Sequence, residues 1–331
     1  MITSFANYVL ASPRRLAMPI GVYAGLELTG ASLRDAVSDP QAQAEAVLAL
    51  HARFATSVLL TAMDLSAEAE AFGCAIRMSE DEIPTVVGRR ASTLAEIRSL
   101  PSPTPGDRRT RVHLEAAHAL VTHGDAPVLG GMIGPFSLAG RIFGVSEALE
   151  VTIADPALIF ELLEKTTNFL AAYAAAFREA GASGVIMAEP AAGLLSPRGL
   201  ATFSTPFVQR IVSAAQTKDF AVVYHNCGAR LAHLPRILES GAEVYHFGEP
   251  MDLPAALQLA DGQYILCGNL SPTAVFHDGS PGQVRQATMS LLAACQAHPN
   301  FVISSGCDLP PHTPLDNLAA FFDAVAAFNP L

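Results

Sequence analysis

The sequence lacks tryptophan and has only two lysines, Lys165 and Lys218, and only 15% of its 331 residues are charged. A typical globular domain carries about 25% charged residues. The shortage of lysine leaves a Schiff-base mechanism few candidate residues. Half of the residues (50%) are hydrophobic. This composition excludes an intrinsically disordered chain and indicates a large buried core.

No apolar run is long enough to cross a membrane. The longest stretch without Asp, Glu, Lys or Arg covers residues 286–307, and several polar residues and Pro299 interrupt it. A spanning helix needs about 20 predominantly apolar residues. Near the N-terminus the basic pair Arg14–Arg15 follows the apolar stretch, whereas a secretory signal has the opposite order. We therefore expect a cytoplasmic protein that does not bind membranes.

Positive charge and cysteine are both scarce. The chain has 20 Lys and Arg against 31 Asp and Glu, which gives a net charge of −11. Such a field repels polyanions, so nucleic acid is not an expected partner. The five cysteines are Cys74, Cys227, Cys267, Cys295 and Cys307. An odd and sparse set argues against a disulfide framework and leaves thiolate chemistry or metal ligation open.

Short apolar runs alternate with longer amphipathic stretches, a pattern typical of a parallel sheet with crossover helices. The pattern predicts strands over residues 18–24, 56–61, 127–133, 184–188, 220–225, 242–247, 264–268 and 301–304. It predicts helices that include residues 156–180, 197–217, 229–239, 282–297 and 315–328. Eight strand–helix pairs indicate an α/β fold of the (β/α)8 TIM-barrel type, with a doubly wound open sheet as the alternative.

One segment does not fit the alternation. Residues 79–111 hold four prolines and six arginines, and we expect them to form an inserted covering segment. We find no internal repeat and no interdomain linker. The sequence therefore predicts a single domain over residues 1–331.

Metal-capable side chains follow several predicted strands. His225 and Cys227 stand two positions apart at the end of the fifth strand, where alternate side chains point the same way. Cys307 follows the last strand, and a barrel brings all its strand ends to one face. One imidazole and two thiolates are a zinc-type set that leaves a fourth position open. Glu249, after the sixth strand, is a candidate displaceable fourth ligand.

A packing role is the alternative for these residues, because cysteine is among the most buried residue types. Cys74, Cys267 and Cys295 have no such partners and are expected to pack. We expect a structural role for His246, which lies inside the sixth strand between two aromatic residues.

Other strand ends carry further candidates. Asp64 is a candidate site carboxylate or a helix cap. Gly134 either lets a ligand approach the backbone or makes a tight turn. Glu189 and Asn269 each follow a strand directly, so a barrel places them at the same face.

Six motifs together resemble a known family. They are MDLSAEAEAFG (63–73), GPFSLAG (134–140), AEPAAGLLSP (188–197), YHNCG (224–228), GNLSP (268–272) and SGCDLPPHTPLDNL (305–318). In this order they resemble the uroporphyrinogen decarboxylase superfamily and, within it, its zinc-dependent cobamide methyltransferases, such as methylcobamide:coenzyme M methyltransferases. The resemblance covers most of the chain.

The resemblance implies zinc ligands at His225, Cys227 and Cys307, because this set separates the methyltransferases from the decarboxylases. It places Asp64 where the decarboxylases keep a catalytic aspartate. The arginine-rich N-terminal signature of those decarboxylases is missing. The family's usual acidic residue after the sixth strand is Gly248 here, with Glu249 beside it.

The implied activity is methyl transfer between methylcobamide, carried by a partner corrinoid protein, and a small thiol that zinc activates as the attacking thiolate. Glu189, Asp64 and Asn269 are expected to orient the substrate, and Gly134 to admit it. Three alternatives stay open. The direction can be reversed, with a methyl ether or amine as donor to a Co(I) corrinoid; the protein can be a cofactor-free decarboxylase of the uroporphyrinogen type; or it can be a non-catalytic protein with structural zinc.

Overall fold

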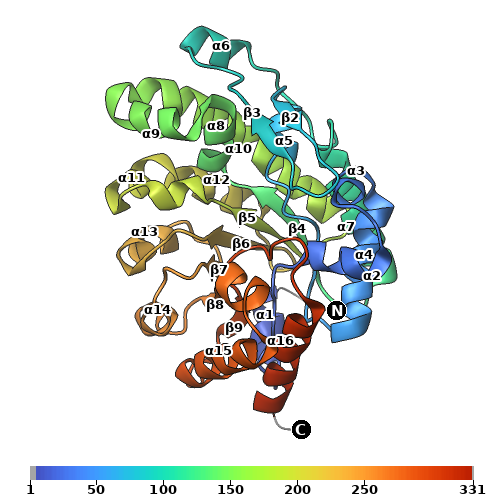
Figure 1. The fold of residues 1–331 in the computed structure, drawn as a ribbon. Coiled ribbons are helices and arrows are strands. Elements are labelled where there is room, and N and C mark those ends of the chain that lie inside the picture. The colour runs from blue at the N-terminus through green and yellow to red at the C-terminus, as the bar shows by residue number, and fades with distance from the viewer. Residues whose placement is uncertain (1–4, 330–331) are drawn as a thin grey trace.

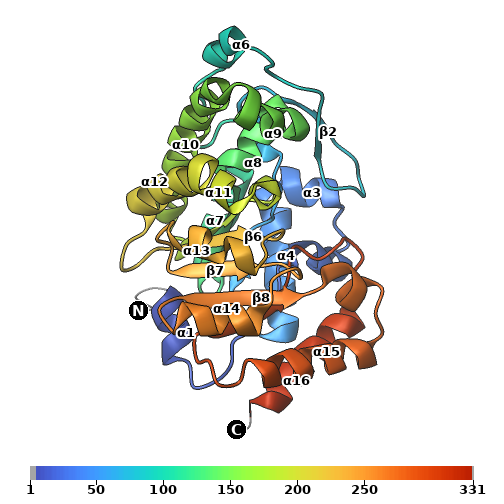
Figure 2. The same ribbon diagram turned by 90° about the vertical axis from the view of Figure 1, so that its left-hand side faces the viewer.

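A curled parallel sheet with helices around it forms the centre of the computed structural model, which describes residues 5–329 (Figures 1 and 2). The strands of this sheet are β1 (Leu59–Leu60), β4 (Val128–Ile133), β5 (Gly184–Ala188), β6 (Ala221–Asn226), β7 (Val244–Phe247), β8 (Ile265–Leu270) and β9 (Phe301–Ser305). They lie side by side in this chain order, and every pair is parallel. The expected α/β, barrel-like fold is therefore confirmed.

Helices connect the strands and cover the outside of the sheet. The α-helices are α1 (Phe5–Ala11), α2 (Leu26–Thr29), α3 (Leu33–Ser38), α4 (Pro40–Phe54), α5 (Ala67–Ala71), α6 (Leu94–Ser99), α7 (Thr110–His123), α8 (Pro135–Phe143), α9 (Val145–Ala154), α10 (Pro156–Glu179), α11 (Pro197–Phe203), α12 (Thr205–Ala215), α13 (Leu234–Leu238), α14 (Leu253–Ala260), α15 (Pro281–Ala294) and α16 (Leu315–Phe328). The shorter 3-10 and π elements are η1 (Val22–Gly25), η2 (Ala191–Leu194), η3 (Leu231–His233) and η4 (Pro272–His277).

The expected strand over residues 18–24 is wrong. In its place Ala17 alone forms a parallel bridge, to Ile303 of β9, and the chain then enters η1. Pro19 interrupts the ladder because proline has no N–H to donate.

The segment around Ala17 nevertheless contacts both edges of the sheet. The N–H of Met18 donates to the carbonyl of Ile303 over 2.9 Å. On the other side the N–H of Ala17 donates to the Ser57 hydroxyl, just before β1, over 3.3 Å. The segment therefore occupies the place of an eighth strand and closes the barrel.

The helices expected over residues 156–180, 282–297 and 315–328 correspond to α10, α15 and α16. The helix expected over residues 197–217 is two helices, α11 and α12, which meet at Ser204. Pro206 in the first turn of α12 has no N–H for the bond that a continuous helix would need. The helix expected over residues 229–239 is η3 followed by α13.

Residues 79–111 lie outside the main sheet. They contain β3 (Thr85–Val87), which pairs antiparallel with β2 (Ala75–Arg77), and they contain α6. In Figure 1 this hairpin and α6 lie at the top of the molecule. Near the end of the segment, Arg109 stands directly before α7, and its side chain reaches back to the barrel.

Every residue of β4, β5, β6, β7 and β9 is buried, and in β8 every residue except Asn269 is buried, as expected where helices cover a parallel sheet. One cluster of buried apolar side chains runs from Phe5 to Val325. The single domain over residues 1–331 stays a prediction. Within residues 5–329 no helix is both long and apolar enough to cross a membrane, and a cytoplasmic location stays a prediction.

Candidate metal centre

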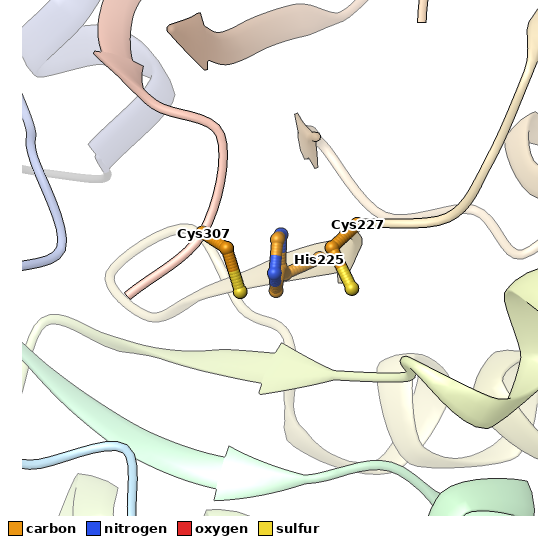
Figure 3. A group of neighbouring side chains, drawn as sticks. All are labelled: His225, Cys227 and Cys307. Atoms are coloured by element: carbon orange, nitrogen blue, oxygen red, sulfur yellow. The ribbon is translucent and has the colours of Figure 1, made fainter. Parts of the chain in front are cut away.

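Three predicted ligands meet at the ends of two strands. His225 lies in β6, Cys227 follows β6 directly, and Cys307 follows β9. One ligand atom from each lies within 4.8 Å of the others (Figure 3). Among residues 5–329 this is the one group of three or more His, Cys, Asp or Glu side chains close enough to share a metal ion. We name it the thiol–imidazole cluster.

The donor atoms of this cluster fit a zinc ion. Nε2 of His225 is buried and has no hydrogen-bond partner, and an unpartnered buried ring nitrogen is costly unless a ligand meets it. Both cysteines are free thiols with partly exposed side chains. A nitrogen and two sulfurs form a set that zinc prefers, and three protein ligands leave one tetrahedral position open.

The two thiols share a hydrogen bond, and this separates their acidities. The bond lowers the pKa of Cys227 to about 7 against the opposing effect of burial. The same bond, together with burial, raises the pKa of Cys307 to about 12. The pair therefore releases its first proton more easily than an isolated thiol does, which favours a metal because thiolates are the ligating form.

The backbone around the two cysteines is closely packed. A Cβ at Gly248, after β7, would lie 2.1 Å from the carbonyl oxygen of Cys227, and a Cβ at Gly306 would lie 2.9 Å from the backbone nitrogen of Glu249. The loops after β6, β7 and β9 therefore touch backbone to backbone. Only glycine fits at these two positions without moving a neighbouring loop.

Glu249 and Asn269 lie at the edge of this arrangement. Glu249 is exposed and is not among the residues whose ligand atoms gather. The amide nitrogen of Asn269 donates to the carbonyls of Gly248 (3.0 Å) and Met251 (2.7 Å). Asn269 therefore fixes the loop that carries Glu249.

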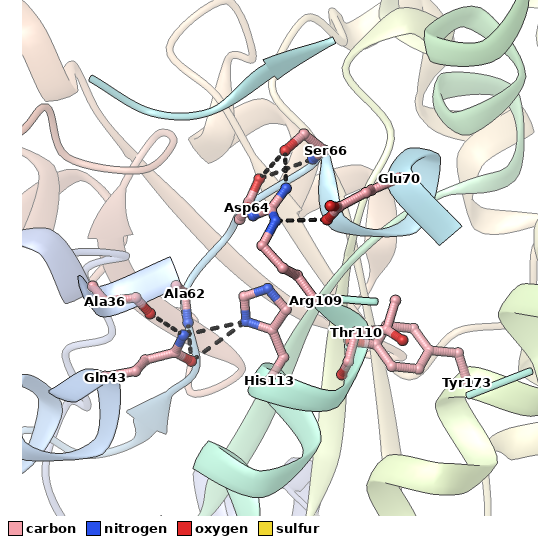
Figure 4. A network of polar contacts seen from close by, with 10 residues as sticks. All are labelled: Ala36, Gln43, Ala62, Asp64, Ser66, Glu70, Arg109, Thr110, His113 and Tyr173. Atoms are coloured by element: carbon pink, nitrogen blue, oxygen red, sulfur yellow. Dashed lines mark hydrogen bonds and ion pairs between the residues drawn. The ribbon is translucent and has the colours of Figure 1, made fainter. Parts of the chain in front are cut away.

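Asp64 belongs to a separate group, which we name the carboxylate cluster: Asp64, Ser66, Glu70 and Arg109 (Figure 4). The guanidinium of Arg109 forms ion pairs with Asp64 and, over 2.7 Å, with Glu70. Ser66 donates its hydroxyl to Asp64 over 2.6 Å. The side chain of Asp64 is fully buried and that of Arg109 is 11% exposed. The Asp64 carboxylate is therefore neutralised by the covering segment.

Glu189 is also occupied by protein groups. Its carboxylate accepts hydrogen bonds from the N–H of Phe136 (2.8 Å), the N–H of Ser137 (2.9 Å) and the hydroxyl of Ser137 (2.7 Å), all in the first turn of α8. Burial raises its pKa to about 7. A Cβ at Gly134 would lie 2.2 Å from Cγ of Glu189, so Gly134 admits the side chain of Glu189 to this helix end.

Sequence reasoning assigned no site role to His246. Its Nδ1 lies 2.8 Å from Nδ1 of His225, on the side of that ring opposite to the free Nε2. The two rings are T-shaped, with centroids 4.6 Å apart. The signal in the sequence is a single polar residue in the otherwise apolar strand VYHF.

Comparisons with known proteins identify the family of the chain. The profile of the family "Uroporphyrinogen decarboxylase (URO-D)" matches residues 11–328. The chain belongs to the URO-D family. Within residues 5–329 its metal-capable group is the His and Cys set of β6 and β9.

Relatives in the URO-D family carry two kinds of name. A methylcobamide:CoM methyltransferase of Methanosarcina acetivorans is 28% identical over 298 residues, which cover 88% of this chain and 86% of that protein. A uroporphyrinogen decarboxylase of Pseudoalteromonas atlantica is 23% identical over 291 residues, covering 84% and 80%. The solved structure of a methyltransferase from Methanosarcina mazei superimposes with a TM-score of 0.88 at 24% identity and covers 98% of both chains. The structural likeness shows the shared fold, and the methyltransferase relatives support the expected class of enzyme.

Proposed function

We propose that this chain is a zinc-dependent methyltransferase that moves a methyl group between a corrinoid and a small thiol, with the corrinoid carried by a partner protein. The thiol–imidazole cluster carries the proposal, because it offers three zinc-type ligand atoms within 4.8 Å of one another. Relatives named methylcobamide:CoM methyltransferases lend support, and CoM is therefore the first thiol to test.

Each part of the chain has a defined task in this proposal. His225, Cys227 and Cys307 hold the metal, and the packed loops at Gly248 and Gly306 keep the two sulfurs in place. Zinc bound there would act as a Lewis acid that keeps a substrate thiol deprotonated near neutral pH. Asn269 supports the loop that carries Glu249.

The alternatives receive less support from the same observations. A decarboxylase would need Asp64 free to meet its substrate, but this carboxylate is buried and paired with Arg109. A structural zinc site has four protein ligands, whereas three side chains gather among residues 5–329. The reverse direction, with a methyl ether or amine as donor, would use the same ligand set and is distinguished only by its substrates.

Metal analysis of the purified protein is the first test. We expect about one zinc per chain, and Cys307→Ala should lose it. Cys74→Ala is a matched control, since Cys74 is a buried free thiol outside the cluster. If the wild-type protein binds no zinc after incubation with zinc salts, the proposal is wrong.

Activity separates the remaining possibilities. Zinc-loaded protein is mixed with methylcob(III)alamin and either CoM or homocysteine, and the corrinoid absorption bands are followed. We expect thiol-dependent demethylation that Cys307→Ala abolishes. If only a methyl ether or amine with Co(I) corrinoid reacts, the direction is reversed. If zinc is bound and no methyl donor or acceptor reacts, the zinc is structural.

A further inference from the structure

The back of the His225 ring contacts a second buried histidine. The parallel register of β6 and β7 pairs His225 with His246, so both side chains point to the same side of the sheet. Their Nδ1 atoms are 2.8 Å apart, and the residues are 2% and 0% exposed. Both rings are shielded from bulk solvent, so the protein groups around the contact determine where its protons lie.

The contact is the first step of a chain that crosses the barrel. Nε2 of His246 lies 2.8 Å from the hydroxyl of Ser304 in β9. The hydroxyl of Ser304 lies 2.5 Å from the carbonyl oxygen of Met18, in the segment that closes the barrel. The chain therefore starts at His225 and ends at a backbone carbonyl.

That carbonyl fixes the direction of every hydrogen bond in the chain. A carbonyl oxygen can only accept, so Ser304 uses its single hydrogen on Met18. The Ser304 oxygen must then accept from Nε2–H of His246. A neutral His246 with a proton on Nε2 has a bare Nδ1, which accepts from Nδ1–H of His225.

A second carbonyl leads to the same assignment. The backbone oxygen of His246 lies 3.3 Å from Nδ1 of His225 and also requires a proton on that nitrogen. With the proton on Nδ1, Nε2 of a neutral His225 keeps a free lone pair. This is the nitrogen that is buried without a partner at the thiol–imidazole cluster.

We propose that His246 and Ser304 are positioning residues that hold His225 in the tautomer whose Nε2 is free to ligate a metal. The inference rests on the proposed zinc site. In the other tautomer a proton would occupy Nε2, and the bare Nδ1 of His225 would face a carbonyl oxygen. Partners of this kind generally raise metal affinity by fixing the tautomer and ring orientation of the ligand.

Zinc affinity provides the test, measured by competition with a chromophoric chelator and without any turnover. His246→Phe keeps a ring but removes the acceptor, and we expect zinc to bind about 10- to 100-fold more weakly. Ser304→Ala frees the tautomer of His246, and we expect a smaller loss. His246→Asn returns an acceptor oxygen near the Nδ1 position, and we expect it to recover most of the affinity.

His113→Phe is the matched control. His113 is a buried histidine, 2% exposed, and its Nδ1 contacts the Gln43 side chain rather than the cluster. It should lose stability as His246→Phe does but keep wild-type zinc affinity. Cobalt substitution adds a spectroscopic readout, because the ligand-field bands of His246→Phe should shift, whereas those of His113→Phe should not.

The outcomes separate this inference from the proposed function. If wild-type protein binds no zinc, the proposed function fails and the inference fails with it. If wild type binds zinc and His246→Phe matches it within twofold, only the inference is overturned. It is also overturned if His246→Asn is as weak as His246→Phe, because packing would then explain the loss. Should His246→Phe fail to fold, unchanged zinc affinity in Ser304→Ala overturns it.

Discussion

The two polar groups at the barrel mouth differ in what their atoms are free to do. In the carboxylate cluster, Asp64 and Glu70 are paired with Arg109. Glu189, which follows β5, is likewise occupied, because it accepts three hydrogen bonds from α8. In the thiol–imidazole cluster Nε2 of His225 has no partner and both thiols are partly exposed. One group is saturated by the protein, and the other presents unused ligand atoms.

The difference shows that burial of an acidic residue at a strand end does not by itself indicate chemistry. A buried carboxyl group needs charge or hydrogen-bond partners, and here the covering segment supplies them to Asp64 and the N-terminus of α8 supplies them to Glu189. Neutral imidazole and thiol groups cost less free energy to bury than a charged carboxylate does, so they can remain buried without a bound ligand. We therefore expect substitutions in the first group to change stability and those in the second to change metal binding.

Arg109→Met should have the largest effect on stability. It leaves the buried Asp64 carboxylate without its charge partner, and we expect a loss of about 3–5 kcal/mol in the free energy of unfolding, measured with urea. The double variant Asp64→Asn, Arg109→Met should regain part of the lost stability. Zinc content of the folded fraction should not change. Loss of zinc from folded Arg109→Met would show that the two groups are coupled and would break the comparison.

Glu189→Gln should change how stability depends on pH. The pKa of Glu189 is raised from 4.5 to about 7 in the folded protein, so the native state binds the proton more tightly than the unfolded chain. Its contribution to stability is therefore complete below about pH 4.5 and is lost as pH rises through about 7. The wild-type advantage over Glu189→Gln should shrink by up to about 1.4 kcal/mol per pH unit in this window.

Urea unfolding of both proteins at several pH values between 4.5 and 8 measures this slope. Glu68, whose pKa burial also raises to about 7, titrates in both proteins and therefore cancels in the difference. A pH-independent difference would mean that the α8 helix end stabilises the charged carboxylate as strongly as water does.

Gly134→Ala should destabilise the protein without affecting zinc. The new Cβ would lie 2.2 Å from Cγ of Glu189, and overpacking of this kind costs about 1–3 kcal/mol. Thermal unfolding with and without zinc measures both quantities. An alanine variant as stable as wild type would show that Glu189 can leave the helix end, which would reopen its role as a substrate-orienting group.

Glu161→Gln should cause the smallest loss of stability, and it serves as the reference for breaking an exposed ion pair. Arg98, from the same covering segment as Arg109, lies 3.4 Å from Glu161, and their side chains are 63% and 39% exposed. Exposed pairs contribute about 0–1 kcal/mol. A loss in the range of Arg109→Met would mean that attachment of the covering segment, rather than burial of a carboxylate, explains the difference between the groups.

The sequence predicted those parts of the molecule that depend on local rules. The apolar run of β5 is bounded by polar residues and was recognised with its correct ends. His225 and Cys227 were paired because side chains alternate along a strand, and Cys307 joined them because a barrel gathers its strand ends. The strand expected at residues 18–24 fails at Pro19, where the missing N–H outweighs the apolar pattern.

What the sequence could not show depends on distant contacts. The pairing of Asp64 with Arg109 joins residues 45 positions apart through a segment without regular alternation. The contact of His225 with His246 follows from the register between β6 and β7, and register depends on the whole sheet. Glu189 was expected to orient a substrate because it follows a strand directly, and its hydrogen bonds to α8 are visible only in three dimensions. Its substrate role stays a prediction.

The glycine after β7 limits how this site can change during evolution. Because the space for a side chain at Gly248 is filled by the carbonyl of Cys227, one mutation cannot place an acidic residue there without displacing a cysteine loop. A lineage that carries this glycine must obtain any additional anionic ligand from a neighbouring position, such as Glu249, or do without one. The packing of the main chain, rather than the choice of side chain, thus restricts the positions from which the site can acquire a new ligand.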